Sequence, residues 1–125
     1  TNEENMANIS SVFHNRLENM YEYPHLQSDT TDNYIEDVIR PNIPSSSLAL
    51  YENVITAYDT YTCEGLPAGP ICSPGLEAIN AALYPAETDY YYFLSSSDGV
   101  FYYASTVEKH EQNIIDAALR EEEQN

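Results

Sequence analysis

The residues best suited to chemistry stand in one short polar segment. Gln27, Asp29 and Thr30 lie within four positions of one another, and residues 25–31 have the turn-prone composition of a loop. Amide, carboxylate and hydroxyl groups on a loop suit hydrogen bonding to the polar groups of a ligand. The Asp29 carboxylate has a further interpretation, polarising an attacking hydroxyl group, and a structural alternative, capping a helix or turn.

Three more residues are candidates for the same binding site. Asn15 either hydrogen-bonds a ligand or serves as a buried structural amide. Tyr58 and Tyr61 either line a cleft or bury their rings with satisfied hydroxyl groups. The neighbouring Arg16 is interpreted as a structural tether to a carboxylate or carbonyl group. We hypothesise that the segment Gln27–Thr30 and the Asn15 amide face one cleft wall.

The sequence predicts no metal site and leaves its two cysteines unassigned. His14, His25 and His110 have no ligand spacing, and nothing resembles a four-ligand zinc site. Cys63 and Cys72 are separated by a Pro/Gly-rich loop. They would close a short disulfide outside the cytoplasm and stay reduced inside it.

Charge narrows the classes of ligand. The 125 residues include 21 acidic and four basic side chains, for a formal net charge of −17. Such a surface repels nucleic acid, whose binding rests on basic groups that displace counterions, and it disfavours anionic lipid headgroups. A neutral or amphoteric ligand fits better, and the charge also keeps the protein soluble. The length suits one domain or most of one.

The sequence shows no targeting or membrane segment. No run approaches the roughly 18 apolar residues that cross a bilayer, and no signal-peptide pattern is present. The chain begins at Thr1 rather than methionine. We therefore expect a processed product or a fragment.

The first half predicts helices separated by loops. Apolar residues at spacings of three and four predict an amphipathic helix over residues 3–21, capped by Asn2 and ended by Pro24. A short helix over residues 32–39 and a flexible surface loop over residues 40–47 follow. The apolar face of the first helix comprises Met6, Ile9, Phe13, Leu17 and Met20.

The second half predicts a loop, a helix, a hairpin and a last helix. Residues 65–70 are rich in proline and glycine and form no regular structure. Pro74 fits the first turn of a helix that ends at Pro85, and residues 89–104 form a β-hairpin with an Asp-Gly turn. A helix over residues 105–122, capped by Ser105 or Thr106, precedes a frayed tail at 121–125. The expected apolar stripes are Leu76, Ile79, Ala82 and Leu83 in the earlier helix, and Val107, Ile114, Ile115, Ala118 and Leu119, packed inward, in the last. The fold class is α+β: N-terminal amphipathic helix, irregular loops, helix, β-hairpin, C-terminal helix.

Five motifs follow one another along nearly the whole chain. They are Ser11–Leu17, Leu26–Thr30, Tyr58–Tyr61, Gly65–Gly75, and the hairpin from Tyr90 to Phe101 with Glu108–His110. In this order they resemble the YceG-like family of endolytic murein transglycosylases. The third motif departs from the family's Tyr-Asn-Thr-Tyr at Asp59.

The resemblance implies a partial lysozyme-like, YceG-like catalytic domain that cuts peptidoglycan glycan strands internally, between N-acetylmuramic acid and N-acetylglucosamine. One glutamic acid protonates the glycosidic oxygen, then acts as base while the muramoyl 6-hydroxyl attacks its own anomeric carbon. The product is a 1,6-anhydro sugar, and no cofactor or metal is needed. The substrate-binding candidates are Asn15, Gln27, Asp29, Thr30, Tyr58 and Tyr61, with Asn15 alternatively orienting the acid.

The resemblance also implies that the catalytic residue is missing. The family's glutamate precedes the first motif, so we expect it upstream of Thr1 and expect this chain to be inactive by itself. Glu3 and Glu4 match the acidic start of the first helix, and Glu108 aligns with the family's closing segment. The implied location is the extracytoplasmic face of the bacterial cytoplasmic membrane. The implied anchor is an N-terminal transmembrane helix outside this chain, and cell-wall synthases are candidate partners.

Two other classes of function stay open. A non-catalytic glycan-binding or partner-docking module fits the absent acid equally well. Family members have also carried the name aminodeoxychorismate lyase, a pyridoxal-phosphate activity that needs a Schiff-base lysine. Lys109 is the only lysine, it stands among charged residues, and no phosphate-cradling loop accompanies it.

Overall fold

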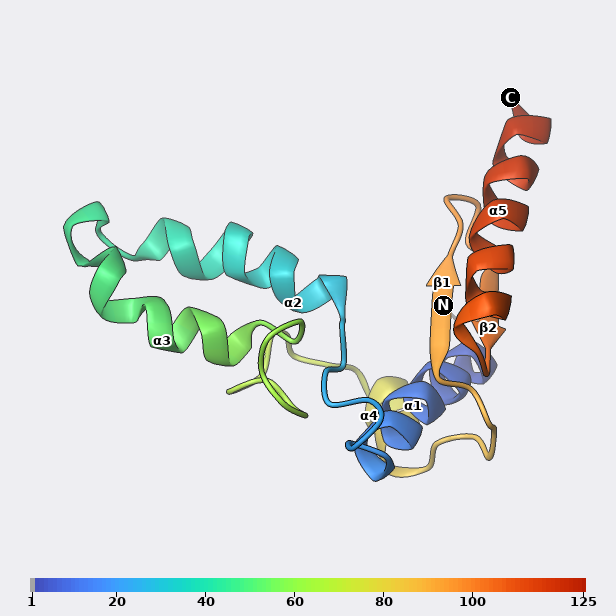
Figure 1. Cartoon of the computed structure of the whole chain (residues 1–125), viewed down its shortest axis with the longest axis horizontal. Helices are drawn as coiled ribbons and strands as arrows, with labels where there is room; N and C mark the ends of the chain where they lie inside the picture. The colour runs from blue at the N-terminus through green and yellow to red at the C-terminus, as the bar shows by residue number, and fades with distance from the viewer. Residues whose placement is uncertain (1) are drawn as a thin grey trace. The chain divides into compact units, whose positions relative to one another are not determined.

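The computed structural model describes residues 2–125 and divides into two compact units. The hairpin unit comprises the residues up to Asn15 together with 74–125, and the loop unit comprises residues 16–73. Helix α1 (Glu3–Glu18) belongs to the first unit over most of its length and runs into the second (Figure 1). Helices and one two-stranded antiparallel sheet make up the described residues, which confirms the predicted α+β class.

Helix α1 begins where its cap predicts and ends earlier than expected. The Asn2 side-chain oxygen accepts a hydrogen bond from the Asn5 N–H at 2.8 Å, as an N-cap does. The helix ends at Glu18, three residues before the predicted end. Short turns take over, with the Asn19 N–H on the Arg16 carbonyl at 3.1 Å. Because Pro24 disfavours helical backbone just before it, the chain leaves the helix ahead of the proline.

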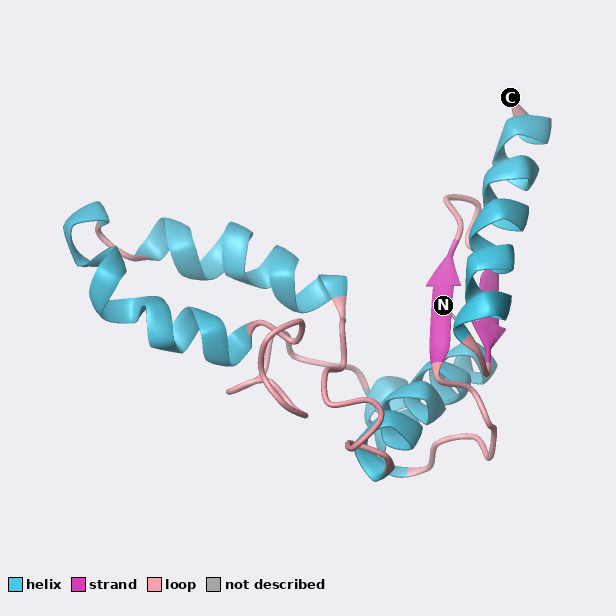
Figure 2. Ribbon diagram, viewed as in Figure 1, coloured by secondary structure: helices cyan, strands magenta, loops and turns pink. Residues whose placement is uncertain are grey.

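The predicted hairpin is present in the hairpin unit (Figure 2). Strands β1 (Tyr92–Ser95) and β2 (Phe101–Ala104) pair antiparallel, with Tyr92 opposite Ala104. Gly99 closes the turn with φ +84°, a left-handed conformation that glycine adopts without steric cost.

Helix α5 (Val107–Gln124) packs on this hairpin through a largely polar face. The Thr106 hydroxyl caps it by accepting the Lys109 N–H at 3.2 Å, as one of the two predicted caps. The Asn113 amide donates to the Tyr103 carbonyl at 3.1 Å, and the His110 ring stacks on Tyr92 at 5.1 Å between centroids. Ala117 is the buried apolar residue of the helix.

The apolar residues predicted to pack inward from the last helix lie elsewhere. Val107, Ile114, Ile115 and Leu119 are 44–53% exposed, and Ala118 is exposed as well, so this prediction is wrong. Polar contacts with the hairpin set the rotation of α5 about its axis, and the apolar stripe is turned away from the strands. Hydrophobic spacing alone therefore gave the wrong face of a correctly predicted helix.

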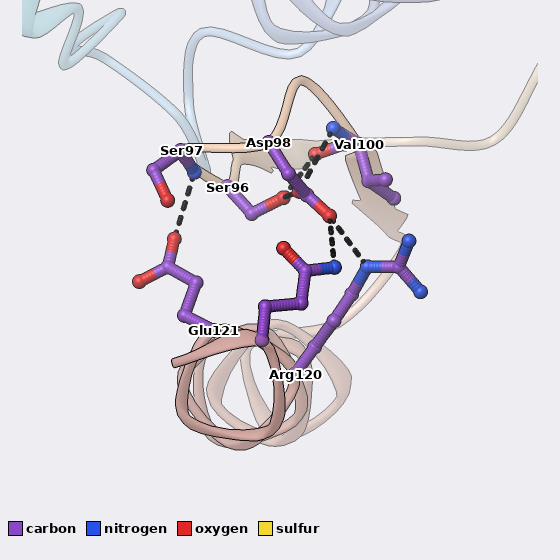
Figure 3. Close-up of polar contacts among 7 residues, drawn as sticks. Ser96, Ser97, Asp98, Val100, Arg120 and Glu121 are labelled. Carbon is purple, nitrogen blue, oxygen red and sulfur yellow. Dashed lines mark hydrogen bonds and ion pairs between the residues drawn. The ribbon is translucent and has the colours of Figure 1, made fainter.

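The hairpin turn is fastened to the end of α5 by charged side chains (Figure 3). The Asp98 carboxylate accepts hydrogen bonds from Arg120 Nε at 2.8 Å and Gln124 Nε2 at 3.0 Å, and from the Ser96 hydroxyl. Glu121 accepts the Ser97 N–H at 2.7 Å. The segment expected to fray, 121–125, is thus helical through Gln124 and takes part in these contacts.

Helix α4 (Leu76–Leu83) completes the hairpin unit. Gly75 is its N-cap residue, so Pro74 precedes the helix instead of standing in its first turn. Within the predicted apolar stripe, Leu76 and Leu83 are exposed, and Ala81, outside that stripe, is buried. His14 Nε2 lies 2.8 Å from the Ala82 carbonyl oxygen, which joins α1 to α4.

The loop unit contains two helices that lie side by side (Figure 1). Helix α2 (Asp29–Tyr34) continues into a π-helical turn (Ile35–Ile39), so the helix predicted over 32–39 begins three residues earlier. Residues 40–47 form two short 3₁₀ turns, and their flexibility stays a prediction.

Helix α3 (Leu48–Tyr58) was not predicted, and Ile55 is its buried residue. The rings of Tyr34 and Tyr58 stack at 5.8 Å between centroids. Residues 65–70 contain neither helix nor strand, as predicted.

We predict that Asp98→Asn destabilises the hairpin unit. The hydrogen bonds from Ser96, Arg120 and Gln124 lower the pKa of Asp98. A lowered folded-state pKa contributes stability above the unfolded value near 3.8, and this stability is lost as pH falls through the folded-state pKa. The variant should unfold a few degrees lower at pH 7, and the difference should shrink below about pH 4.

Thermal unfolding followed by circular dichroism measures this difference. Asp89→Asn is the control, because Asp89 is exposed and has no hydrogen bond within residues 2–125. Equal shifts for both variants at pH 7 would show that the loss comes from net charge alone.

Candidate functional site

The polar segment singled out in the sequence is a loop held by the turn that follows α3. The Thr60 carbonyl accepts the Gln27 N–H at 3.0 Å, and the Thr60 hydroxyl accepts the Ser28 N–H at 2.9 Å. Leu26 is buried at the start of the loop, while Gln27, Asp29 and Thr30 are exposed. The motifs Leu26–Thr30 and Tyr58–Tyr61 therefore form one local structure in the loop unit.

Two buried threonines lie beneath this loop. Thr31 and Thr60 are 4% and 1% exposed, and their hydroxyl oxygens are 2.8 Å apart. The Thr31 hydroxyl also donates to the Ser28 carbonyl at 2.8 Å. Neither residue was among the candidates predicted from the sequence. Thr60 could have been found from its position between Asp59 and Tyr61, inside the motif Tyr58–Tyr61.

Gln27 has an unusual backbone conformation. Its φ is +54°, the one positive φ of a non-glycine residue among residues 2–125. Side-chain sterics make this left-handed region unfavourable, and residues held there are enriched at ligand-binding positions. The Gln27 side chain is exposed, so its amide is available to a ligand.

Asp29 and Tyr61 are brought together by the fold. The Tyr61 hydroxyl donates a hydrogen bond to the Asp29 carboxylate, and the Tyr61 N–H donates to Asp59 Oδ1 at 2.9 Å. The bond to Asp29 comes first among the causes that raise the pKa of Tyr61 to about 12. Asp29 also stands in the first turn of α2, where a carboxylate is favourable.

The other candidates in this unit are placed differently. Tyr58 stacks on Tyr34, and a Cβ atom at Gly69 would lie 2.6 Å from the Tyr58 hydroxyl, so the phenol packs against the Pro/Gly-rich loop. Only glycine permits this close approach. Thr30 is exposed in the first turn of α2.

A pair of carboxyl groups, Asp32 and Asp59, lies beside the loop. Burial is the first cause that raises the pKa of Asp32, followed by a side-chain hydrogen bond with Asp59. The negative charges of Asp29 and Glu36 act in the same direction. Asp59 stands where the motif Tyr58–Tyr61 differs from the Tyr-Asn-Thr-Tyr pattern that it resembles. An asparagine at this position would not form a carboxyl pair with Asp32.

Asn15 and Arg16 hold backbone groups in their own units. Asn15 Nδ2 donates to the carbonyl oxygens of Thr88 at 3.0 Å and Tyr90 at 2.9 Å, within the hairpin unit. This is the contact expected of a structural amide, and a ligand role would fall to its oxygen. In the loop unit, Arg16 donates to the His25 carbonyl at 2.8 Å, the tether predicted for it. The convergence of Asn15 with the polar loop stays a prediction.

The described residues add two findings about cofactors and membranes. Within residues 2–125 no group of three or more His, Cys, Asp or Glu side chains is arranged to hold a metal ion. Cys63 and Cys72 are free thiols, and burial raises the pKa of Cys63. None of the helices described between residues 2 and 125 has the length and apolar character to span a membrane.

Comparison with known proteins identifies the class. The model of the YceG-like family matches residues 1–116, and the chain belongs to this family. It is 35% identical over 102 residues to an endolytic murein transglycosylase of Bacillus subtilis, covering 82% of this chain and 26% of that protein. An endolytic murein transglycosylase of Streptococcus pneumoniae is 33% identical over 110 residues, covering 86% of this chain and 19% of that protein.

A solved structure supports the same family. A YceG-like protein of Listeria monocytogenes is 35% identical, with a TM-score of 0.66, over 85% of this chain and 33% of the solved chain. The present chain spans about a quarter or less of the two transglycosylases.

We predict that Asp29→Asn lowers the pKa of Tyr61 from about 12 toward the ordinary value of 10. Removing the carboxylate charge removes the strongest acceptor of the phenol proton. The pH titration of the Tyr61 ring carbon, assigned with Tyr61→Phe, measures the change by NMR. Asp37→Asn removes an exposed carboxylate without a hydrogen bond and should leave the Tyr61 titration unaltered. A Tyr61 pKa unaffected by Asp29→Asn contradicts the contact.

We predict that Asp32→Asn stabilises the protein at neutral pH. Because the folded-state pKa of Asp32 is raised, the folded state holds its proton more tightly than the unfolded chain. Stability is therefore lost as pH rises from the unfolded value near 3.8 through the raised pKa. The variant should unfold a few degrees higher at pH 7 than the wild-type chain, and near pH 3 the advantage should vanish.

Melting temperatures measured between pH 3 and pH 7 test this dependence. Asp37→Asn again controls for the loss of one charge. A pH-independent difference between Asp32→Asn and the wild-type chain would exclude titration of Asp32 as its origin.

Proposed function

We propose that this chain is the substrate-binding portion of an endolytic peptidoglycan lytic transglycosylase. In this proposal the longer protein cleaves bonds between N-acetylmuramic acid and N-acetylglucosamine, leaves 1,6-anhydro-N-acetylmuramic acid ends, and acts in cell-wall biogenesis. The family membership and the two relatives named endolytic murein transglycosylase support it.

The observation that carries the proposal is the exposed polar loop. It presents the Gln27 amide and the Asp29 carboxylate on one short segment, with the Tyr61 hydroxyl bound to Asp29 from the turn after α3. An amide donates to and accepts from sugar hydroxyl and N-acetyl groups, and a carboxylate accepts hydroxyl protons. The hydroxyl and N-acetyl groups of these sugars are uncharged, which suits a chain of net charge −17.

The chemical step assigns a different task to each part of the protein. A single carboxyl group, kept protonated near neutral pH by burial, protonates the glycosidic oxygen and then removes the proton of the muramoyl 6-hydroxyl. We assign this acid to a glutamate outside residues 1–125 and expect these residues alone to bind glycan without cleaving it. Orientation of the sugar by the loop raises the fraction of productive encounters.

The cellular setting belongs to the same proposal. We place the protein on the extracytoplasmic face of the bacterial cytoplasmic membrane, held by an anchor outside this chain. Peptidoglycan glycan strands are its substrate, and cell-wall synthases are candidate partners. No nucleic acid and no direct membrane contact of these residues is expected, because the acidic surface repels both.

We predict that a protein comprising these residues and the family glutamate releases 1,6-anhydro-muropeptides from purified peptidoglycan. Gln27→Ala should lower kcat/KM by about tenfold, the effect of one lost hydrogen bond to substrate. Liquid chromatography with mass spectrometry identifies the products. Asn33→Ala removes an exposed amide of α2 that has no hydrogen bond in residues 2–125 and should retain full activity.

The products separate the classes of function. Reducing ends without anhydro sugars would show hydrolysis and contradict the lytic route. Binding of glycan without any cleavage by the longer protein would favour a non-catalytic module.

A further inference from the structure

We propose that Thr60 is a positioning residue for glycan recognition: its buried side-chain hydroxyl fixes Ser28, and thereby holds the Gln27 backbone in its left-handed conformation and the Gln27 amide toward the ligand. This inference rests on the proposed function for its ligand, a peptidoglycan glycan strand. The structural part, the dependence of Gln27 on Thr60, can be tested without any ligand.

The contacts form a closed ring of hydrogen bonds on one residue. The Ser28 N–H donates to the Thr60 hydroxyl at 2.9 Å, and the Thr60 hydroxyl lies 2.8 Å from the Thr31 hydroxyl. The Thr31 hydroxyl donates to the Ser28 carbonyl at 2.8 Å. The Thr60 hydroxyl also lies 3.2 Å from the Ser28 carbonyl oxygen, so its single proton goes either to Thr31 or to that carbonyl, and both arrangements leave all three donors bonded. Side chains therefore bind both backbone polar groups of Ser28, and its carbonyl also accepts the Thr31 N–H at 3.1 Å.

Burial makes this ring hard to replace. Thr60 and Thr31 are almost completely shielded from solvent, so water has no free access to the groups that a missing hydroxyl would leave unpaired. A buried polar group without a partner is costly, and the backbone would move to regain one. The partner of the Ser28 N–H is thus a single oxygen atom of Thr60.

Ser28 separates the two candidate ligand-binding residues. Gln27 precedes it at φ +54°, with its own N–H bound to the Thr60 carbonyl at 3.0 Å. Asp29 follows it and is held by the hydroxyl of Tyr61, the residue next to Thr60. Thr60 therefore holds the Gln27 and Ser28 backbone through its carbonyl and hydroxyl groups, while Tyr61 holds the Asp29 side chain.

The left-handed conformation of Gln27 needs such a restraint. A non-glycine residue returns to negative φ when the surrounding contacts no longer determine its conformation. That change would redirect the Gln27 side chain. Loss of the Thr60 hydroxyl should therefore act on ligand binding through Gln27, although Thr60 itself is too buried to contact a sugar.

The first test measures the loop without ligand. Thr60→Val keeps the shape of the side chain and removes the hydroxyl, whereas Thr60→Ser keeps the hydroxyl. We expect Thr60→Val to speed amide hydrogen exchange at Ser28 at least about tenfold and to move the three-bond HN–Hα coupling of Gln27 away from its wild-type value, with Thr60→Ser close to wild type. A Gln27 coupling unchanged in Thr60→Val overturns the inference, whatever the protein binds.

The second test uses soluble glycan strands of alternating N-acetylglucosamine and N-acetylmuramic acid, titrated against the 125-residue chain by NMR. Thr60→Val should weaken binding by about tenfold, and Thr60→Ser should retain most of it. Thr56→Val is the matched control, because the Thr56 hydroxyl bonds only the Glu52 carbonyl of its own helix at 2.9 Å. Equal losses in Thr56→Val and Thr60→Val would overturn the role of Thr60.

A double-mutant cycle separates positioning from a general loss of structure. If Thr60 acts through Gln27, Thr60→Val should add little to the binding defect of Gln27→Ala. Additive losses contradict the inference. Should Thr60→Val fail to fold, the cycle is run with Thr31→Val, which opens the same ring from its other hydroxyl. Absence of glycan binding by the wild-type chain, with the exchange result intact, would count against the proposed function and leave the Thr60 restraint standing.

Discussion

Irregular backbone segments of this chain are held by hydrogen bonds to residues from distant parts of the sequence. Inside a protein, an N–H or carbonyl group without a partner is costly, so irregular segments need donors and acceptors from elsewhere. In the loop unit Thr60 supplies them to Gln27 and Ser28, and Arg16 binds the His25 carbonyl. In the hairpin unit the amides of Asn15 and Asn113 do the same. The buried apolar residues are mostly small or aliphatic and few, which leaves these polar contacts to specify the structure.

This dependence explains which parts of the fold were predictable. The cap at Asn2, the Asp-Gly turn and the Thr106 cap are local signals, and each gave its element correctly. The face of α5 was mispredicted because the Asp98 contacts and Asn113 join residues far apart in sequence. The spacing of apolar residues predicts an apolar stripe on the helix. It does not predict which contacts with other elements set the rotation of the helix about its axis. Helix α3 escaped prediction because its apolar residues face several directions and only Ile55 is buried.

The candidate site was predictable to a similar degree and for similar reasons. Gln27, Asp29 and Tyr61 were candidates because of their polar groups. The structure places Gln27 and Asp29 on one anchored segment and binds Tyr61 to Asp29 from the turn after α3. Nothing in the sequence distinguishes Thr31 and Thr60 from threonines on the surface. Only their burial in the structure identifies them. Asn15 illustrates the opposite case, since its amide donors are already bound to Thr88 and Tyr90.

Within the proposed function, the charge of the loop would limit the part of a glycan strand that it can contact. Asp29, Asp32 and Asp59 lie around Tyr61, and after burial and the hydrogen bond with Asp59, the negative charges of its neighbours add to the raised pKa of Asp32. An anionic group on a ligand would add to this repulsion, whereas hydroxyl and N-acetyl groups bring donors that carboxylates accept without a change in net charge. Within the proposed function, the polar loop is therefore suited to the neutral faces of the sugars. In that proposal, selectivity would come from the fixed direction of Gln27 and Asp29, and not from attraction between opposite charges.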